Sequence, residues 1–194
     1  MKIGVLALQG SFIEHKKVLI SLGVDAVEVR LPEQLSDLDG LIIPGGESTT
    51  IGKLAVAYNL LEPLKTFGVQ RAIWGTCAGA IFLAKNIHRE QPTLQLMDIT
   101  IERNAFGRQL DSFETDLDVP DLEKLEGEQR PFHAVFIRAP LIESVSDGAV
   151  CLASLPDGRI VAARQGRLLA TSFHPELTAD TRFHRYFLKL ASRG

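Results

Sequence analysis

The sequence has few cysteines and no long apolar run, and both shortages narrow the classes of protein it can encode. Its only cysteines, Cys77 and Cys151, lie far apart, so we expect neither a disulfide scaffold nor a thiolate zinc site. No apolar run approaches the roughly 20 residues of a membrane-spanning helix, and the segment MKIGVLALQG lacks the cleavage site of a signal peptide. We therefore expect a cytoplasmic protein that holds no metal ion or other cofactor and does not act at a membrane.

The sequence also lacks a large excess of charge of either sign. Its formal net charge is −3, so no strongly basic surface for nucleic acid is expected. Hydrophobic residues make up 45% and charged residues 23%, which is the usual balance of a soluble globular protein. Because the chain has 194 residues and no linker or internal repeat, we expect residues 1–194 to form a single domain.

Apolar runs alternate with helical patterns through the first half of the chain. Strands are expected at residues 3–8, 24–29, 41–43 and 72–74. Ser11 and Glu14 form an S-x-x-E capping box that predicts a helix ending near Gly23, and a second helix is expected to start near Ser48. This order of strands and helices predicts a parallel sheet with helices on both faces.

The second half is richer in short strands. They are expected at residues 98–102, 113–117, 135–137, 149–154, 160–163 and 168–172. The polar stretch 122–131 is expected to be a surface loop, and residues 179–192 form an amphipathic helix pattern. The fold class that follows is α/β: a three-layer α/β/α sandwich whose central sheet is mostly parallel, with an antiparallel extension.

The segment GTCAG, residues 75–79, directly follows an apolar strand. A cysteine between two glycines in a strand-to-helix turn is typical of a nucleophile elbow, in which the central residue has a strained backbone. The helix that follows aims its first N–H groups at the sulfur, which favours the thiolate. On its own, this pattern leaves two interpretations of Cys77 open, a packing cysteine or a nucleophile. Cys151 lies in an expected strand without a nearby base and is interpreted as a core residue.

A thiol that performs acyl transfer needs a base, and His174 is the best candidate among the five histidines. It follows the apolar strand that ends in the segment TSFHPEL, and Glu176 lies two residues further on, where an extended chain points it the same way. Together with the cysteine elbow, this pair favours a Cys-His-Glu triad. The other histidines are expected on helix surfaces (His15, His184) or in polar loops (His88, His133).

The segment IIPGGEST, residues 42–49, ends a strand in two glycines. The N–H groups of Gly45 and Gly46, with that of Ala78 after the nucleophile, are candidates for an oxyanion hole. A phosphate-binding loop is the competing interpretation, but neither G-x-x-x-x-G-K-[ST] nor G-x-G-x-x-G is present. Capping of the following helix by Ser48 is expected and is compatible with an oxyanion role.

The motifs PGGEST, GTCAG and SFHPE, in this order, resemble those of class I (triad) glutamine amidotransferases, whose fold is flavodoxin-like. A closer resemblance, over nearly the whole chain, is to the glutaminase subunits of pyridoxal 5′-phosphate synthase, the PdxT/SNO family. It rests on LALQGSFIEH, PGGESTT, GTCAGAIFLAK, ERNAFGRQLDSFE, FIRAP, GRIVAARQG and TSFHPELT. The segment ERNAFGRQLDSFE is the most specific, because other glutaminase subunits share the cysteine elbow without it.

This resemblance implies an activity and a partner. The activity is hydrolysis of L-glutamine to L-glutamate and ammonia through a γ-glutamyl thioester. The partner is a (β/α)₈ synthase subunit that uses the ammonia to make pyridoxal 5′-phosphate in vitamin B6 biosynthesis, in a large hetero-oligomer with twelve copies of each subunit. Two alternatives stay open, a glutaminase subunit of another synthase and a catalytically silent regulatory binder.

The resemblance also implies roles for individual residues. Cys77 is the implied nucleophile, His174 the base and then the acid, and Glu176 the group that orients His174. The residues implied to contact glutamine are Gly46, Glu47, Ser48, Arg103, Ile137 and Arg138. An arginine suits the carboxylate of a free amino acid, because its N–H groups are charge-assisted donors, but the residues alone do not decide between Arg103 and Arg138.

Overall fold

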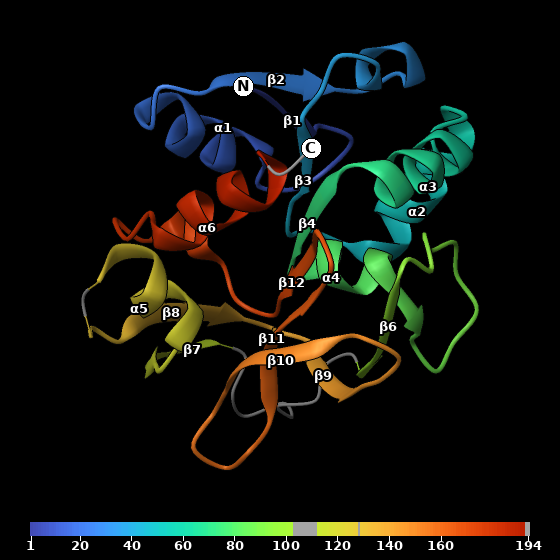
Figure 1. The fold of residues 1–194 in the computed structure, drawn as a ribbon. Helices are drawn as coiled ribbons and strands as arrows, with labels where there is room; N and C mark the ends of the chain where they lie inside the picture. The colour runs from blue at the N-terminus through green and yellow to red at the C-terminus, as the bar shows by residue number, and fades with distance from the viewer. Residues whose placement is uncertain (103–111, 128, 193–194) are drawn as a thin grey trace.

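The computed structural model describes residues 1–102, 112–127 and 129–192, and its central element is a ten-stranded sheet (Figure 1). The strands of this sheet are β1 (Lys2–Leu6), β2 (Asp25–Val29), β3 (Gly40–Ile43), β4 (Ala72–Thr76), β5 (Ala84–Asn86), β6 (Met97–Glu102), β9 (Leu141–Val145), β10 (Val150–Ser154), β11 (Ile160–Gln165) and β12 (Leu168–Thr171). A separate antiparallel pair consists of β7 (Ser112–Leu117) and β8 (Phe132–Ile137). The helices are α1 (Phe12–Ser21), α2 (Ser48–Ala57), α3 (Leu61–Gln70), α4 (Ala78–Leu83), α5 (Pro120–Glu126) and α6 (Arg182–Ala191), with 3₁₀ turns at Pro32–Leu35 and Pro175–Leu177.

The sheet has a parallel part and an antiparallel part. Its strand order is β2-β1-β3-β4-β12-β11-β9-β6-β5, and β10 pairs with β11. The pairs from β2 to β12 are all parallel, whereas β11 runs antiparallel to β12, β9 and β10, and β6 runs antiparallel to β9. The predicted fold class, a mostly parallel sheet with an antiparallel extension, is confirmed.

Helices cover both faces of the sheet, with α1 and α6 on one side and α2 and α3 on the other (Figure 1). Alternation along the strands divides the core accordingly. In β4, for example, Ile73 packs with the residues under α2 and α3, while Trp74 packs with Phe183 and Phe187 of α6. Trp74 and both phenylalanines are completely buried, so truncating any one of them to alanine is expected to cost about 3–5 kcal/mol.

The parallel part of the sheet decides where a site can form. Strands β1, β3, β4 and β12 are parallel neighbours, so their carboxyl ends meet at one edge, where ligands bind in open α/β sheets. The segments that follow these four strands contain Gln9, Gly45, Cys77 and His174. Three of these four residues are those that the sequence motifs single out.

Some expected elements differ from those observed. The stretch 122–131 is not a loop throughout, because α5 extends to Glu126 and buries Leu122 in the core. Helix α3 and strands β5 and β9 were not expected from the sequence. Within the described residues, none of the helices has both the length and the apolar character needed to cross a membrane.

Neither expected helix cap is formed as predicted. Ser11 occupies the N-cap position of α1, but its side chain makes no capping hydrogen bond and instead donates to Oε1 of Glu176 over 2.7 Å. Helix α2 is capped by Glu47, whose carboxylate accepts hydrogen bonds from the N–H groups of Thr49 and Thr50, and not by Ser48. The capping-box prediction for α1 and the Ser48 cap for α2 are therefore both wrong.

Candidate active site

Cys77 lies in a strained turn between β4 and α4. Its φ of 48° and ψ of −105° are unusual for a residue with a side chain. A Cβ on Gly75 would collide with the backbone of Gly79, and a Cβ on Gly79 would collide with the carbonyl of Ile43. The elbow geometry predicted from GTCAG is confirmed, and the two glycines are required because backbone segments pass too closely for any side chain.

His174 follows β12 and is fixed by its backbone and its side chain. Its N–H donates to the carbonyl of Val135, and its Nδ1–H donates to Oε1 of Glu176 over 2.8 Å. Residues Pro175–Leu177 form a 3₁₀ turn, so the imidazole and the carboxylate meet across a tight turn. The pairing expected for these two residues is present, but the expected extended backbone between them is not.

Gly45 brings the histidine and the cysteine together. A Cβ placed on Gly45 would lie 2.5 Å from Cε1 of His174 and 3.3 Å from Cβ of Cys77. Both side chains therefore approach the same side of Gly45, in the loop after β3. The structure thus brings Cys77, His174 and Glu176 together, and it leaves no space for a side chain at position 45.

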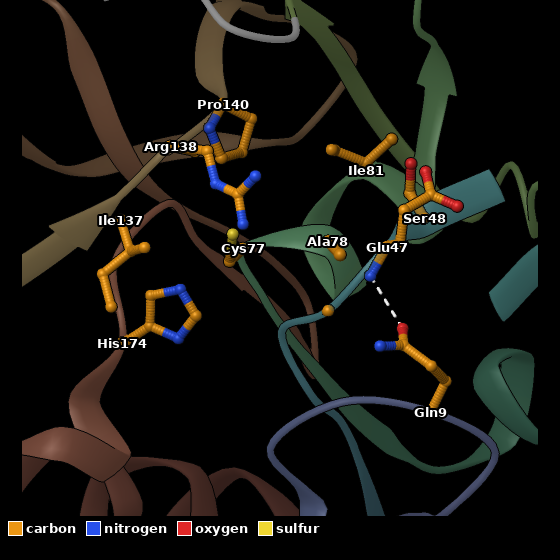
Figure 2. A pocket seen from close by; sticks show the side chains of 11 residues that line it. Gln9, Glu47, Ser48, Cys77, Ala78, Ile81, Ile137, Arg138, Pro140 and His174 are labelled. Atoms are coloured by element: carbon orange, nitrogen blue, oxygen red, sulfur yellow. Dashed lines mark hydrogen bonds between the residues drawn. The ribbon is translucent and has the colours of Figure 1, made fainter. Parts of the chain in front are cut away.

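The loop of Gly45 and Gly46 is held from the segment after β1. The carbonyl of Gly45 accepts a hydrogen bond from the Ser11 N–H over 3.0 Å, and Oε1 of Gln9 accepts one from the Glu47 N–H over 2.7 Å (Figure 2). Gln9 was given no role from the sequence. The available signal was its place after the first parallel strand, at the edge where the other site residues gather.

A cavity of about 350 Å³ opens in front of Cys77. It is lined by Gln9, Gly46, Glu47, Ser48, Cys77, Ala78, Ile81, Ile137, Arg138, Pro140 and His174. Figure 2 shows the guanidinium of Arg138 extending toward Cys77, with His174 and Ile137 on one side of the cysteine and Glu47 and Ser48 on the other. All the expected glutamine-contacting residues line this cavity except Arg103, which lies outside the described residues.

The site stabilises an imidazolium next to a carboxylate. Burial lowers the pKa of His174, but hydrogen bonds with Cys77 and Glu176 outweigh it and raise that pKa to about 10. Burial raises the pKa of Glu176, but the protonated ring of His174 and the hydrogen bonds from His174 and Ser11 outweigh it and lower that pKa to about 2. Glu176 is therefore ionised and His174 readily holds a proton.

Glu47 lines the cavity, and its carboxylate caps helix α2. Partial burial raises its pKa, but hydrogen bonds from Thr50 and Thr49 outweigh this and lower the pKa to about 2. The neighbouring Ser48 is buried and its Oγ accepts a hydrogen bond from Nε2 of Gln91 over 3.3 Å. In the part of the chain that the structure describes, no group of three or more His, Cys, Asp or Glu side chains is placed to hold a metal ion.

Three expectations for other histidines and for the second cysteine are wrong. His15 and His184 are not at helix surfaces but completely buried, because α1 and α6 face each other across the end of β4. His133 lies on strand β8, not in a loop, where it pairs with Glu114 and Asp116. Cys151 is exposed and is not a core residue, whereas His88 is exposed in polar surroundings as expected.

Comparison with known proteins places these observations in a family. Residues 5–192 match the SNO glutamine amidotransferase family. The chain belongs to this family. The expected resemblance is thereby confirmed.

Relatives within the family are similar over their whole length. The chain is 63% identical to a protein of Herpetosiphon aurantiacus, and the alignment covers 98% of this chain and 100% of the relative. It is 58% identical to a protein of Pelotomaculum thermopropionicum, and that alignment covers 100% of this chain and 97% of the relative. Both relatives are named "Pyridoxal 5'-phosphate synthase subunit PdxT". A solved structure described as a glutamine amidotransferase is 52% identical and superposes with a TM-score of 0.91 over 98% of both chains.

Proposed function

We propose that residues 1–194 form a single glutaminase domain that hydrolyses L-glutamine to L-glutamate and ammonia, as the glutaminase subunit of a pyridoxal 5′-phosphate synthase. The observation that carries this proposal is that Cys77 and His174 lie together beside Gly45, with His174 hydrogen-bonded to Glu176. Membership of a glutamine amidotransferase family supports glutamine as the substrate, and the names of two relatives support the role as a subunit of pyridoxal 5′-phosphate synthase.

The first half of the reaction makes a thioester. The proton that Cys77 and His174 share lies on His174, whose pKa is raised to about 10, and the Cys77 thiolate attacks the side-chain amide carbon of glutamine. The N–H groups of Gly45, Gly46 and Ala78 stabilise the oxyanion of the tetrahedral intermediate. His174 then donates its proton to the departing nitrogen, so that ammonia leaves and a γ-glutamyl thioester remains on Cys77.

The second half returns the enzyme to its starting state. His174, now neutral, takes a proton from a water molecule that attacks the thioester carbonyl. Collapse of the second intermediate releases glutamic acid, which loses its carboxyl proton to water, and restores the Cys77 thiolate beside protonated His174. In both halves Glu176 holds the imidazole in one orientation and stabilises its protonated form.

The cavity supplies groups for the rest of the substrate. Arg138 is exposed, has an unusual φ of 43° and lines the cavity, so its guanidinium is available to the α-carboxylate of glutamine. Gly46, Glu47, Ser48 and Ile137 are proposed to contact the substrate as well, as is Arg103. Because the Glu47 carboxylate caps α2, the contact proposed for Glu47 comes from its backbone.

The proposed partner is a (β/α)₈ synthase subunit that consumes the ammonia, in a large assembly of both subunits. Ammonia released into bulk water is largely protonated and lost as a nucleophile, so docking of a consuming subunit over the cavity suits the chemistry. The names of the relatives, which call them subunits of pyridoxal 5′-phosphate synthase, support this partner.

The test is a glutaminase assay of the chain with and without its synthase subunit. We expect activity to rise strongly on mixing, and Cys77→Ala to abolish it without unfolding the chain. The matched control is Cys151→Ala, which removes the exposed second cysteine and should leave activity unchanged. Retained activity in Cys77→Ala would refute the proposal.

A further inference from the structure

Three polar side chains are buried beside Glu176 without lining the cavity, and the mechanism above gives them no role. His15 comes from α1, Thr76 from the end of β4 and His184 from α6, and each is 0% exposed. Nε2 of His15 lies 3.3 Å from Oε2 of Glu176 and 3.2 Å from Oγ1 of Thr76, while its Nδ1 lies 3.0 Å from Nε2 of His184. We call these three residues the rear cluster.

The two oxygens of Glu176 have different surroundings. Oε1 accepts hydrogen bonds from Ser11 and His174. Oε2 is buried and accepts no well-aligned hydrogen bond from the described residues. Nε2 of His15, which is hydrogen-bonded to Oγ1 of Thr76, is the nitrogen that faces it, at 3.3 Å. An ionised oxygen buried without a donor is costly, so the carboxylate is stable in this position only if Nε2 of His15 carries a hydrogen.

This requirement fixes the tautomers of both histidines. If Nε2 of His15 carries the hydrogen, its Nδ1 accepts and Nε2 of His184 must donate. Nδ1 of His184 is then a bare acceptor, which agrees with its lack of a hydrogen-bond partner among the described side chains. The opposite tautomers would turn a lone pair of His15 toward Oε2 and leave a buried N–H on His184 without an acceptor.

The charges around the pair agree with neutral rings. Burial lowers the pKa of His15, and the nearby His174 lowers it further. Glu176 and Glu14 raise it, but by less. Burial, followed by His15, holds the pKa of His184 well below its usual value, with Glu176 opposing. The rear cluster therefore presents an N–H to the carboxylate without neutralising its charge, which remains available to His174.

We propose that His15, held in its Nε2–H tautomer by His184, is a positioning residue that fixes the Glu176 carboxylate behind the catalytic imidazole. Ser11 and His174 bind Oε1 only, so a carboxylate without His15 is held through one oxygen and can pivot about it. Such a pivot would misalign Nδ1 of His174 and, through the ring, the nitrogen that exchanges protons with Cys77. The inference rests on the proposed function in taking Cys77 and His174 as the reacting pair.

Kinetic measurements with the synthase subunit present test the positioning role. His15→Leu removes the donor and should lower kcat about 10- to 100-fold, the range typical for partners that orient a functional histidine, while KM for glutamine changes less than about twofold because the cavity is intact. His15→Gln restores an N–H at nearly the same place and should recover most of kcat. Leu19→Ala is the matched control, because Leu19 is also fully buried on α1 but belongs to the apolar core; it should lower the Tm and leave kcat unchanged.

Two outcomes overturn the inference: wild-type kcat in His15→Leu, or a His15→Gln variant no more active than His15→Leu. Absence of Cys77-dependent activity in the wild-type mixture would instead refute the proposed function. Nitrogen NMR of the wild-type chain separates the two failures and needs neither activity nor a variant that folds. Neutral Nε2–H signals for His15 and His184 at pH 7 support the rear cluster, and an Nδ1–H tautomer or a protonated ring in His15 overturns it.

Discussion

Two groups of histidines and carboxylates in this molecule have similar contacts and opposite behaviour. On the β7–β8 sheet, exposed His133 lies 2.9 Å from both Asp116 and Glu114, and hydrogen bonds with these carboxylates raise its pKa. Inside the fold, His15 also faces a carboxylate, that of Glu176, yet burial lowers its pKa. We call the first group the surface cluster.

The difference teaches that a neighbouring carboxylate does not by itself decide whether a histidine is charged. Water still solvates the exposed ring of His133, so desolvation opposes the protonated form less than the hydrogen bonds with two carboxylates favour it. His15 is completely buried, and its desolvation outweighs the attraction of Glu176 and Glu14. His174 shows the third case, in which burial is outweighed because Cys77 and Glu176 both bind the ring.

The largest expected effect comes from neutralising the interior carboxylate. Glu176→Gln keeps the shape of the side chain but removes the charge that stabilises the imidazolium, and its amide can donate to the wrong ring nitrogen. We expect kcat to fall by up to about 10⁴-fold, as for the equivalent change in other triads. Glu114→Gln in the surface cluster is the control and should leave kcat unchanged; comparable losses in both variants would contradict the distinction.

The second expected effect comes from the close packing of Gly45 against His174, which leaves no room for a larger residue at position 45. In Gly45→Ala the new methyl group would lie 2.5 Å from Cε1 of His174 and must displace the ring. A displacement of this kind is expected to lower kcat/KM about 100-fold or more. Gly23→Ala is the matched control: none of the described residues lies within 4 Å of the added methyl, and the φ of +75° at Gly23 makes this variant a test of backbone strain. It should lower the Tm without affecting activity.

A smaller effect concerns stability in mild acid. The pKa of His184 is lower in the folded chain than in the unfolded chain, so below about pH 6.5 the unfolded chain takes up a proton first. The stability that the neutral ring provides is therefore present above this pH and is lost below it, by at most about 1.4 kcal/mol per pH unit. Between pH 7 and pH 5 the Tm of His184→Phe should fall less than the Tm of the wild type. An equal fall in both proteins would argue against a neutral buried ring.

The smallest effect is expected in the surface cluster. The pKa of His133 is raised, so any stability it contributes is present below about pH 6.5 and is lost as the pH rises through its folded value. Because the pair is exposed, we expect His133→Gln to leave the Tm unchanged at pH 8 and to lower it only slightly at pH 5.5. High salt should remove the slight loss, whereas a loss that persists in high salt would indicate a desolvated pair.

Much of the fold could be predicted because its strands are marked locally. Buried parallel strands such as β3 read as short apolar runs, and turn residues separate the strands of the second half. Helix α5 was missed because its charged residues outnumber the apolar ones that it buries, of which Leu122 is the clearest. Strand β9 contains charged Glu143 and pairs with distant partners, so local propensity does not reveal it.

The front of the candidate site was also predictable, because Cys77, Gly45 and His174 belong to short motifs at strand ends. Its rear was not. Ser11 fits a capping box in the sequence, but its hydroxyl bonds a carboxylate 165 positions away, and only the folded chain reveals that contact. His15 and His184 have the same difficulty, since their burial results from two helices that meet across a strand end.

Ser11 has a mechanical consequence for the site. Its N–H holds the carbonyl of Gly45, and its hydroxyl holds the carboxylate of Glu176. One residue at the start of α1 thus connects the glycine loop to the carboxylate of the triad. The loop and the carboxylate must shift together with α1, or one of these two hydrogen bonds must break.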